Sequence, residues 1–153
     1  VMFGHILVAT DGSEYSEKAI LEGAKLAKAL DSKLTVVTAV QTAAPHIVHG
    51  KIIGPGLDER RESAKAEAKG ILDTAVEIAA QVNVPAETEH VLNETPYDAI
   101  IETAKNKGCD LIVMASHGRS GLTALLLGSE TQKVLTHSKI PVLVHRSYTA
   151  PSR

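Results

Sequence analysis

The sequence predicts an α/β protein, an open and doubly wound parallel sheet of five strands with helices on both faces. Short apolar segments alternate along the chain with longer segments whose apolar residues recur at helical spacing. Several short segments are nearly uninterrupted runs of Val, Ile and Leu, which is typical of strands covered on both faces. Hydrophobic residues make up 44% of the chain and aromatic residues only 3%, so aliphatic side chains must build the core.

Each element has its own pattern. The β-branched segment 34–40 (LTVVTAV) suits the interior of the sheet, and the polar segment 86–91 (AETEHV) suits an edge. Thr95 and Pro96 provide an N-cap and a proline at the first helical position, and residues 129–132 (SETQ) match a capping box. The predicted strands are residues 3–9, 34–40, 86–91, 110–115 and 141–145, and the predicted helices run through residues 19–30, 57–82, 95–106 and 129–137.

Residues 41–56 separate the second strand from the longest helix. They contain two prolines and three glycines and show no clear period. We therefore predict one long, irregular and flexible loop here.

Length, composition and charge limit the domains, partners and location that we expect for the protein. We expect one domain over residues 2–146 and a flexible tail over residues 147–153. The formal net charge of −2 argues against nucleic acid or an anionic membrane as partner. A single cysteine, Cys109, agrees with a reducing compartment, and no apolar run approaches the length of a membrane span. The cytoplasm is the expected location.

Ligands of open α/β sheets bind beyond the carboxyl ends of the strands, where the strand order reverses. In the loop after the first strand, Asp11 follows Thr10 and precedes Gly12. Its carboxylate can accept hydrogen bonds from the hydroxyls of a ribose, or it can cap the helix that follows. The sequence leaves both readings open.

The loop after the fourth strand is rich in glycine. It begins Ala115-Ser116-His117-Gly118-Arg119, and Gly128 and Ser129 open the next helix. Glycines let backbone N–H groups approach an anion, and a helix N-terminus attracts phosphate. The alternative is a purely structural turn. Arg119 either neutralises phosphate or is simply solvated.

Other motifs give weaker signals. His46 and His49 lie three residues apart but lack a carboxylate or thiolate set nearby, so we do not expect a metal site. Ser116 and His117 are adjacent, and adjacent side chains rarely point at each other, so we do not expect a nucleophile with its base. Cys109 precedes a buried strand and is expected to be an inert, partly buried thiol. Neither a Walker A motif nor Gly-x-Gly-x-x-Gly after the first strand is found.

Two long segments resemble one known family. Residues 8–20 (VATDGSEYSEKAI) and 114–144 (MASHGRSGLTALLLGSETQKVLTHSKIPVLV), with the length between them, are similar to the universal stress protein family over nearly the whole chain. Its nucleotide-binding branch has the pattern Gly-x2-Gly-x9-Gly-Ser/Thr. Gly118, Gly128 and Ser129 match the last three elements. The resemblance also implies a sheet in which the five strands lie in the order 3-2-1-4-5.

The resemblance implies roles for particular residues. Asp11 would contact the ribose, the main chain of Val40 would meet adenine, and Gly118, Gly128 and Ser129 would hold phosphates. The implied ligand is ATP first, then ADP or AMP, with Mg²⁺ carried by the nucleotide. The remaining candidate contacts are Thr10, Met114, Ala115, His117, Arg119, Glu130 and Thr131.

Two departures from the family pattern matter. Ala115 stands where the pattern has its first glycine, and an alanine methyl restricts the approach of a phosphate. Glu130 follows Ser129, and its carboxylate would repel a triphosphate if it points inward and would be harmless if it points outward.

Our first hypothesis is a nucleotide-binding module for stress response or signalling with at most slow hydrolysis, because no general base or cluster of metal ligands is visible. The alternative is a dimeric interaction protein of the same fold that binds no nucleotide. A hydrolase would rest on fold analogy alone. We expect a homodimer through the apolar last strand, which the family resemblance also implies, although the tail can instead shield that edge. The residues of this interface are Pro141, Val142, Leu143, Val144 and His145.

Overall fold

The computed structural model describes residues 2–92, 95–118 and 126–147. A five-stranded parallel sheet lies at its centre, with the strands in the order β5-β2-β1-β6-β7. The strands are β1 (His5–Ala9), β2 (Lys33–Ala39), β3 (His46–Val48), β4 (Lys51–Ile53), β5 (Glu87–Val91), β6 (Leu111–Ala115) and β7 (Val142–His145). The helices are α1 (Glu14–Leu30), α2 (Leu57–Ala80), α3 (Pro96–Lys107) and α4 (Ser129–His137).

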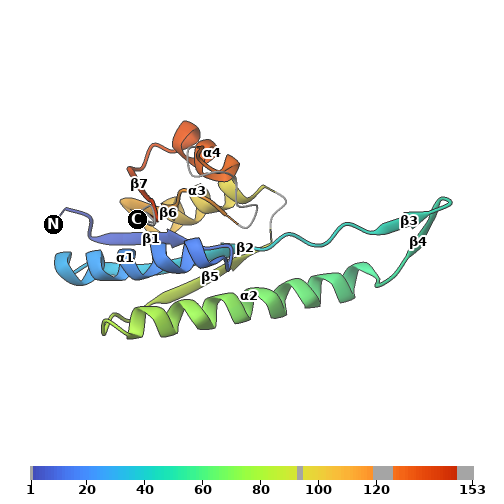
Figure 1. Cartoon of the computed structure of the whole chain (residues 1–153), viewed down its shortest axis with the longest axis horizontal. Helices are drawn as coiled ribbons and strands as arrows, with labels where there is room; N and C mark the ends of the chain where they lie inside the picture. The colour runs from blue at the N-terminus through green and yellow to red at the C-terminus, as the bar shows by residue number, and fades with distance from the viewer. Residues whose placement is uncertain (1, 93–94, 119–125, 148–153) are drawn as a thin grey trace, which may run out of the picture.

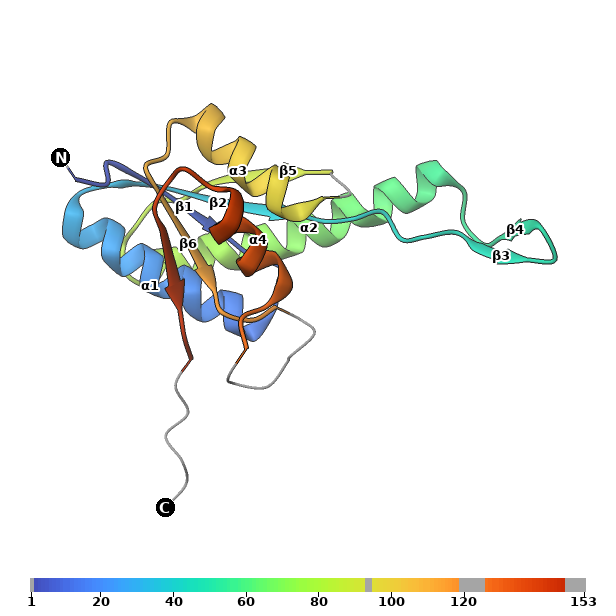
Figure 2. The ribbon, with the colours of Figure 1, turned by 90° about the horizontal axis from the view of Figure 1, so that it is seen from above.

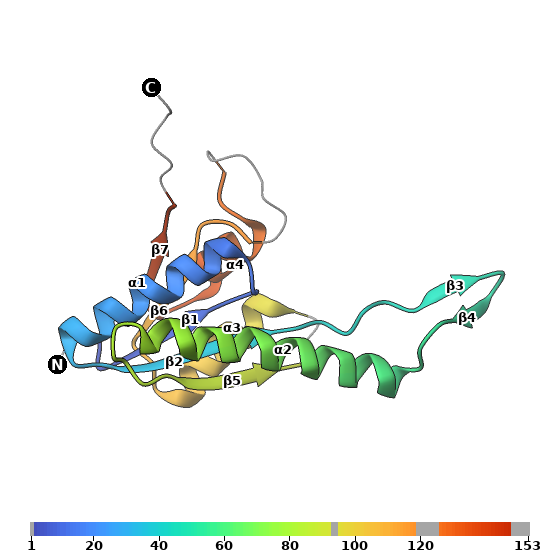
Figure 3. The same cartoon turned by 60° about the horizontal axis from the view of Figure 1, so that its bottom comes forward.

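The predicted fold class is confirmed. Strands β3 and β4 form a separate hairpin, and without them the strand order is 3-2-1-4-5 in sequence terms. The polar segment predicted for an edge is β5, which lies at one end of the sheet. Helices α1 and α2 cover one face of the sheet, and α3 and α4 cover the other (Figures 1 and 3).

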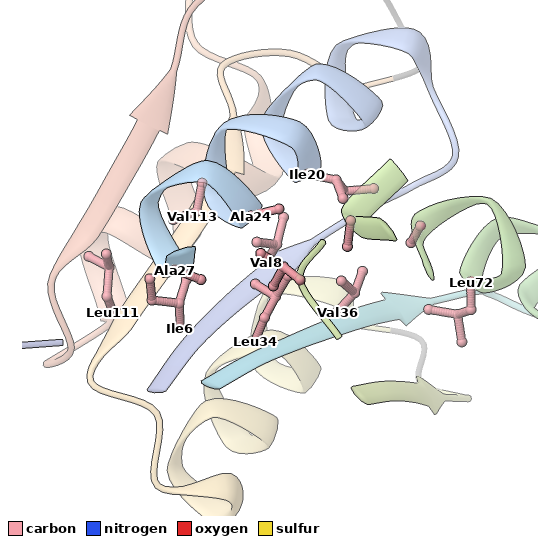
Figure 4. Close-up of a cluster of buried hydrophobic side chains, with 13 residues drawn as sticks. Ile6, Val8, Ile20, Ala24, Ala27, Leu34, Val36, Leu72, Leu111 and Val113 are labelled. Atoms are coloured by element: carbon pink, nitrogen blue, oxygen red, sulfur yellow. The ribbon is translucent and has the colours of Figure 1, made fainter. Parts of the chain in front are cut away.

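Side-chain alternation along the strands divides the core into two layers. Ile6, Val8 and Val36 are fully buried on the face that packs against α1 and α2 (Figure 4). Leu7 and Val37 point to the opposite face, where they join side chains from α3 and α4. Removing each such aliphatic side chain from water contributes about 1.5–3 kcal/mol, so both helix layers are firmly attached to the sheet.

Helix α1 lies unusually close to β1. A Cβ added at Gly23 would lie 2.6 Å from Cγ2 of Val8, which is closer than real atoms approach. A glycine is therefore needed at this crossing. The close contact packs the middle of α1 directly against β1.

The prediction of an irregular loop over residues 41–56 was wrong in part. Its middle forms the antiparallel hairpin β3–β4, in which Val48 pairs with Lys51. The two residues of the turn, His49 and Gly50, both have positive φ, at 51° and 74°. Two consecutive residues with positive φ form the type I′ turn that matches the twist of a hairpin. All six strand residues are exposed, and the hairpin projects from the body of the molecule (Figure 2).

The predicted capping box was also wrong. Gly128 is the N-cap of α4, Ser129 is already helical, and no side chain caps the helix. The Gln132 side chain donates to the Leu127 carbonyl instead. Thr95 is the N-cap of α3 with Pro96 at the first position, as predicted, but the Thr95 side chain makes no capping hydrogen bond.

Within the part of the chain that the structure describes, no helix is both long and apolar enough to cross a bilayer.

Candidate functional site

A cavity of about 410 Å³ opens beyond the carboxyl ends of β1, β2 and β6. The chain runs from β1 outward to β2 and β5, then returns to add β6 and β7 on the other side of β1. The cavity thus lies where the strand order reverses, the usual ligand position in this architecture. Its lining residues are Ala9, Thr10, Asp11, Ser16, Val37, Ala39, Gln41, Pro96, Ile100, Met114, Ala115, His117, Gly118, Gly128, Ser129, Glu130 and Thr131.

The loop after β1 forms one wall. Ser13 is the N-cap of α1, and its side chain accepts a hydrogen bond from the backbone N–H of Ser16. Asp11 is therefore not the helix cap. Oδ1 of Asp11 accepts from the backbone N–H of Ser13 at 2.9 Å, which holds this carboxylate at the cavity. Below it, the hydroxyls of Thr10 and Ser16 share a buried hydrogen bond of 2.9 Å.

The glycine loop after β6 forms the opposite wall. The N–H of Gly128 donates to the Ser116 carbonyl at 2.7 Å and closes the loop. A Cβ added at Gly118 would lie 2.5 Å from Oδ2 of Asp11, so the two walls are in contact there. Neither Gly118 nor Gly128 has positive φ. A Cβ added at Gly128 would lie 3.3 Å from the Ser116 carbonyl oxygen, so both positions leave little room for a side chain.

Ser116 and His117 differ from the prediction. Oγ of Ser116 and Nδ1 of His117 form a hydrogen bond of 2.9 Å although the residues are adjacent. The chain bends directly after β6, and this bend turns both side chains to the same side. Ser116 is buried and does not line the cavity, whereas His117 does, beside the ring of Tyr15. The pair therefore presents no hydroxyl nucleophile to a ligand.

Glu130 points toward the cavity wall. Its Oε2 accepts from the backbone N–H of Tyr97 in the first turn of α3 at 2.9 Å, and its Oε1 lies 3.3 Å from Nζ of Lys133. The carboxylate thus serves as a cap supplied to α3 from another helix, which explains why α3 lacks one of its own. Next to it, the Thr131 hydroxyl donates to the Ala115 carbonyl and fixes α4 to the end of β6.

Comparison with known proteins decides the family. A model of the universal stress protein family matches residues 2–146. The chain belongs to this family. Universal stress protein YxiE of Bacillus subtilis is 40% identical over 95% of this chain and all of its own length.

Solved universal stress proteins share the fold. One in complex with cAMP has a TM-score of 0.71 at 28% identity, covering 96% of this chain and 100% of that one. UspA from Lactobacillus plantarum has a TM-score of 0.74 at 27% identity, covering 95% and 99%. The resemblance that the motifs indicated is confirmed.

The structure brings most of the predicted universal stress protein site together. Ten of the predicted residues line the cavity: Thr10, Asp11, Met114, Ala115, His117, Gly118, Gly128, Ser129, Glu130 and Thr131. Val40 lines a neighbouring cavity of about 460 Å³ that shares Asp11, Ala39, Gln41 and Pro96 with the first. Arg119 lies outside the described residues.

The sequence argument missed most of the apolar lining of the cavity. Ala39, Pro96, Ile100 and Met114 contribute to it, and only Met114 was predicted. Ala39 and Met114 come from the ends of strands, so the rule that ligands bind at carboxyl ends was a usable signal for Ala39. Pro96 and Ile100 lie on α3, whose position over the sheet no sequence motif reveals.

Titratable groups of the lining are mainly acidic. Asp11 and Glu130 are carboxylates, His117 is the one imidazole, and the described lining contains no Lys or Arg. Among the residues that the structure describes, no three His, Cys, Asp or Glu side chains are placed to hold a metal ion. His46 and His49 are exposed on or beside the hairpin.

Cys109 lies away from the cavity. It is buried, and desolvation, helped by the neighbouring charge of Asp110, raises the pKa of its thiol to about 11. A thiol of this kind is almost entirely protonated at neutral pH, in agreement with the predicted inert side chain.

Proposed function

We propose that this universal stress protein binds an adenine nucleotide in the cavity between the β1 and β6 loops and acts as a stress-response or signalling module. The observation that carries the proposal is the mixed lining of this cavity at the switch point, where apolar side chains of β2, α3 and β6 occur together with the Asp11 carboxylate and the glycines that flank the loop after β6. A relative of the same fold at 28% identity was solved in complex with cAMP, which supports a nucleotide as the class of ligand.

Each kind of lining residue suits one part of a nucleotide. The base would lie against Ala39, Ile100 and Met114, which offer apolar contact. The carboxylate of Asp11 would accept hydrogen bonds from the ribose hydroxyls. The phosphates would meet Gly128 and Ser129 at the start of α4, where backbone N–H groups and the helix dipole favour an anion.

Binding, with at most slow hydrolysis, is the proposed output. The family resemblance implies ATP first and ADP or AMP after it. Any Mg²⁺ would arrive with the nucleotide, because the described residues offer no metal cluster of their own. The cytoplasm, which the single cysteine predicts, remains part of the proposal.

Gly118→Ala tests the site. The added Cβ must displace the Asp11 carboxylate, which lies 2.5 Å away. We expect the affinity for AMP, ADP and ATP, measured by calorimetry, to fall at least about tenfold with little change in circular dichroism. Gly70→Ala is the matched control, because a Cβ at Gly70 on α2 meets nothing within 4 Å.

The alternative is a dimeric interaction protein with an empty cavity, which the acidic lining favours. If wild type binds none of the three nucleotides at millimolar concentration, this alternative replaces the proposal. If Gly118→Ala binds as wild type does, a nucleotide is bound elsewhere.

A further inference from the structure

The charges of the described cavity lining oppose the binding of a polyphosphate. A polyphosphate at the start of α4 would lie in a lining whose described residues include two carboxylates and no Lys or Arg. Ser129, at the proposed phosphate end, is followed directly by Glu130. Like charges separated by a few ångströms at the rim of a protein repel appreciably even with solvent screening.

The carboxylate of Glu130 is held in place. The hydrogen bond of 2.9 Å from the Tyr97 N–H joins its Oε2 to the first turn of α3, across the cavity wall that Pro96 lines. A side chain with this partner does not swing freely into solvent to avoid an anion. Because the carboxylate caps α3, moving it away would break the hydrogen bond from the Tyr97 N–H.

Lys133 compensates only part of this charge. Its Nζ lies 3.3 Å from Oε1 of Glu130, but the lysine side chain is half exposed and does not line the cavity. Exposed ion pairs of this spacing on one helix are weak and screened by salt. Glu130 lines the cavity and Lys133 does not, so a ligand in the cavity meets the carboxylate more directly than the ammonium group.

We propose that Glu130 selects nucleotides by the charge of their phosphate chain, so that the cavity favours a monophosphate such as AMP over ATP. The inference rests on the proposed function, keeps the adenine nucleotide as ligand class, and reverses the order of ATP and AMP that the family resemblance implies. AMP places one phosphate at the start of α4, where the helix N-terminus offsets its charge. The additional phosphates of ATP find no cation in the described lining and meet the Glu130 carboxylate.

Glu130→Gln isolates the charge. The amide oxygen of glutamine can still accept from the Tyr97 N–H, so the cap on α3 is kept while the negative charge is removed. Glu102→Gln is the matched control, because Glu102 forms the same kind of pair with Lys105 three residues on, at 3.1 Å, and does not line the cavity. Calorimetry with AMP and ATP, in EDTA and in excess Mg²⁺, gives the ratio of the two dissociation constants for each protein.

We expect wild type to bind AMP more tightly than ATP in EDTA. The ratio of the ATP to the AMP dissociation constant should fall about five- to tenfold in Glu130→Gln, less at high salt, and stay unchanged in Glu102→Gln. An unchanged ratio in Glu130→Gln, with AMP still bound, overturns the selectivity and leaves the proposed function standing. A loss of ATP affinity in Glu130→Gln confined to excess Mg²⁺ also overturns it, because the carboxylate would then hold the metal. If no nucleotide binds wild type, both proposals fail.

Discussion

Asp110 joins the starts of β1 and β6 at the end of the sheet opposite the cavity. Its two carboxylate oxygens accept hydrogen bonds from the backbone N–H groups of His5 and Gly4, each at 3.0 Å. The His5 N–H, then the Gly4 N–H, stabilise the charged form and hold the pKa of Asp110 below its usual value. An exposed carboxylate thus helps to set the register of two neighbouring strands.

Asp110→Asn should lower stability in a pH-dependent way. A carboxyl whose pKa is depressed by folding contributes stability above its unfolded pKa of about 3.9, and this is lost as the pH falls through the lower folded pKa. We therefore expect wild type to exceed Asp110→Asn in free energy of unfolding at pH 6, and the difference to shrink toward pH 3. Urea denaturation at several pH values measures it. A constant difference would mean that packing, not charge, explains the effect.

For single residues, the sequence indicates which side chains are candidates for the site, but not how they are oriented or which residues they contact. Asp11, Gly118, Gly128 and Ser129 could be chosen as candidate nucleotide contacts because they lie in recognisable sequence motifs. The orientation of Glu130 could not, because its partner is the N–H of Tyr97, 33 residues away in the chain. The same holds for the contact between Gly118 and Asp11, which joins loops from two strands.

Helix α2 has a weak point in its middle. Gly70 is exposed within the 24-residue helix Leu57–Ala80, and a Cβ there meets nothing within 4 Å. Glycine in a helix interior costs roughly 0.5–1 kcal/mol relative to alanine, because it loses more backbone freedom on folding.

We therefore expect Gly70→Ala to raise the free energy of unfolding by about 0.5–1 kcal/mol, measured by chemical denaturation. Nucleotide affinity should not change, since Gly70 is remote from the cavity lining. A destabilised variant would show that this face of α2 is packed against something in solution.

At the level of elements, strong patterns were predicted well and short ones poorly. The buried strands and the first two helices follow from apolar runs and apolar spacing, whereas β5 was predicted from a polar segment and α3 and α4 with the help of their start signals. The hairpin over residues 46–53 was missed because its strands are only three residues long and His49 takes a positive φ that no motif announces. The cap of α4 was misplaced by one residue because Gly128 needs no side chain to begin a helix.

The whole molecule has two unlike sheet edges. At the β5 edge, Glu87 and Glu89 form ion pairs with Lys107, and such charges discourage pairing with another strand. The β7 edge, Val142–His145, carries no Lys, Arg, Asp or Glu, and Leu143 is 40% exposed. Right-handed crossovers predicted the doubly wound parallel class, whereas the order of the strands came from the family resemblance.

Among the described residues, β7 has no strand neighbour on the side away from β6, and its hydrogen-bonding groups on that side can pair with another strand. The carbonyls of Pro141 and His145 accept from Ile112 and Ser116 on the β6 side. Because alternate residues of a parallel strand bond to the same neighbour, Val142 and Val144 direct their N–H and C=O groups away from the sheet. Pro141 therefore removes no donor from the free side.

We accordingly predict a homodimer in which β7 pairs with the β7 of a second copy across a two-fold axis. Leu143→Lys tests it, because the exposed side chain tolerates the change in the monomer while two lysines facing each other across the axis would repel. Val142 is unsuitable, since it packs against the core. Light scattering should show a dimer for wild type and a folded monomer for Leu143→Lys. Val76→Lys, on α2 and equally exposed at 40%, should remain dimeric. A monomeric wild type at tens of micromolar, or a dimeric Leu143→Lys, would refute this interface.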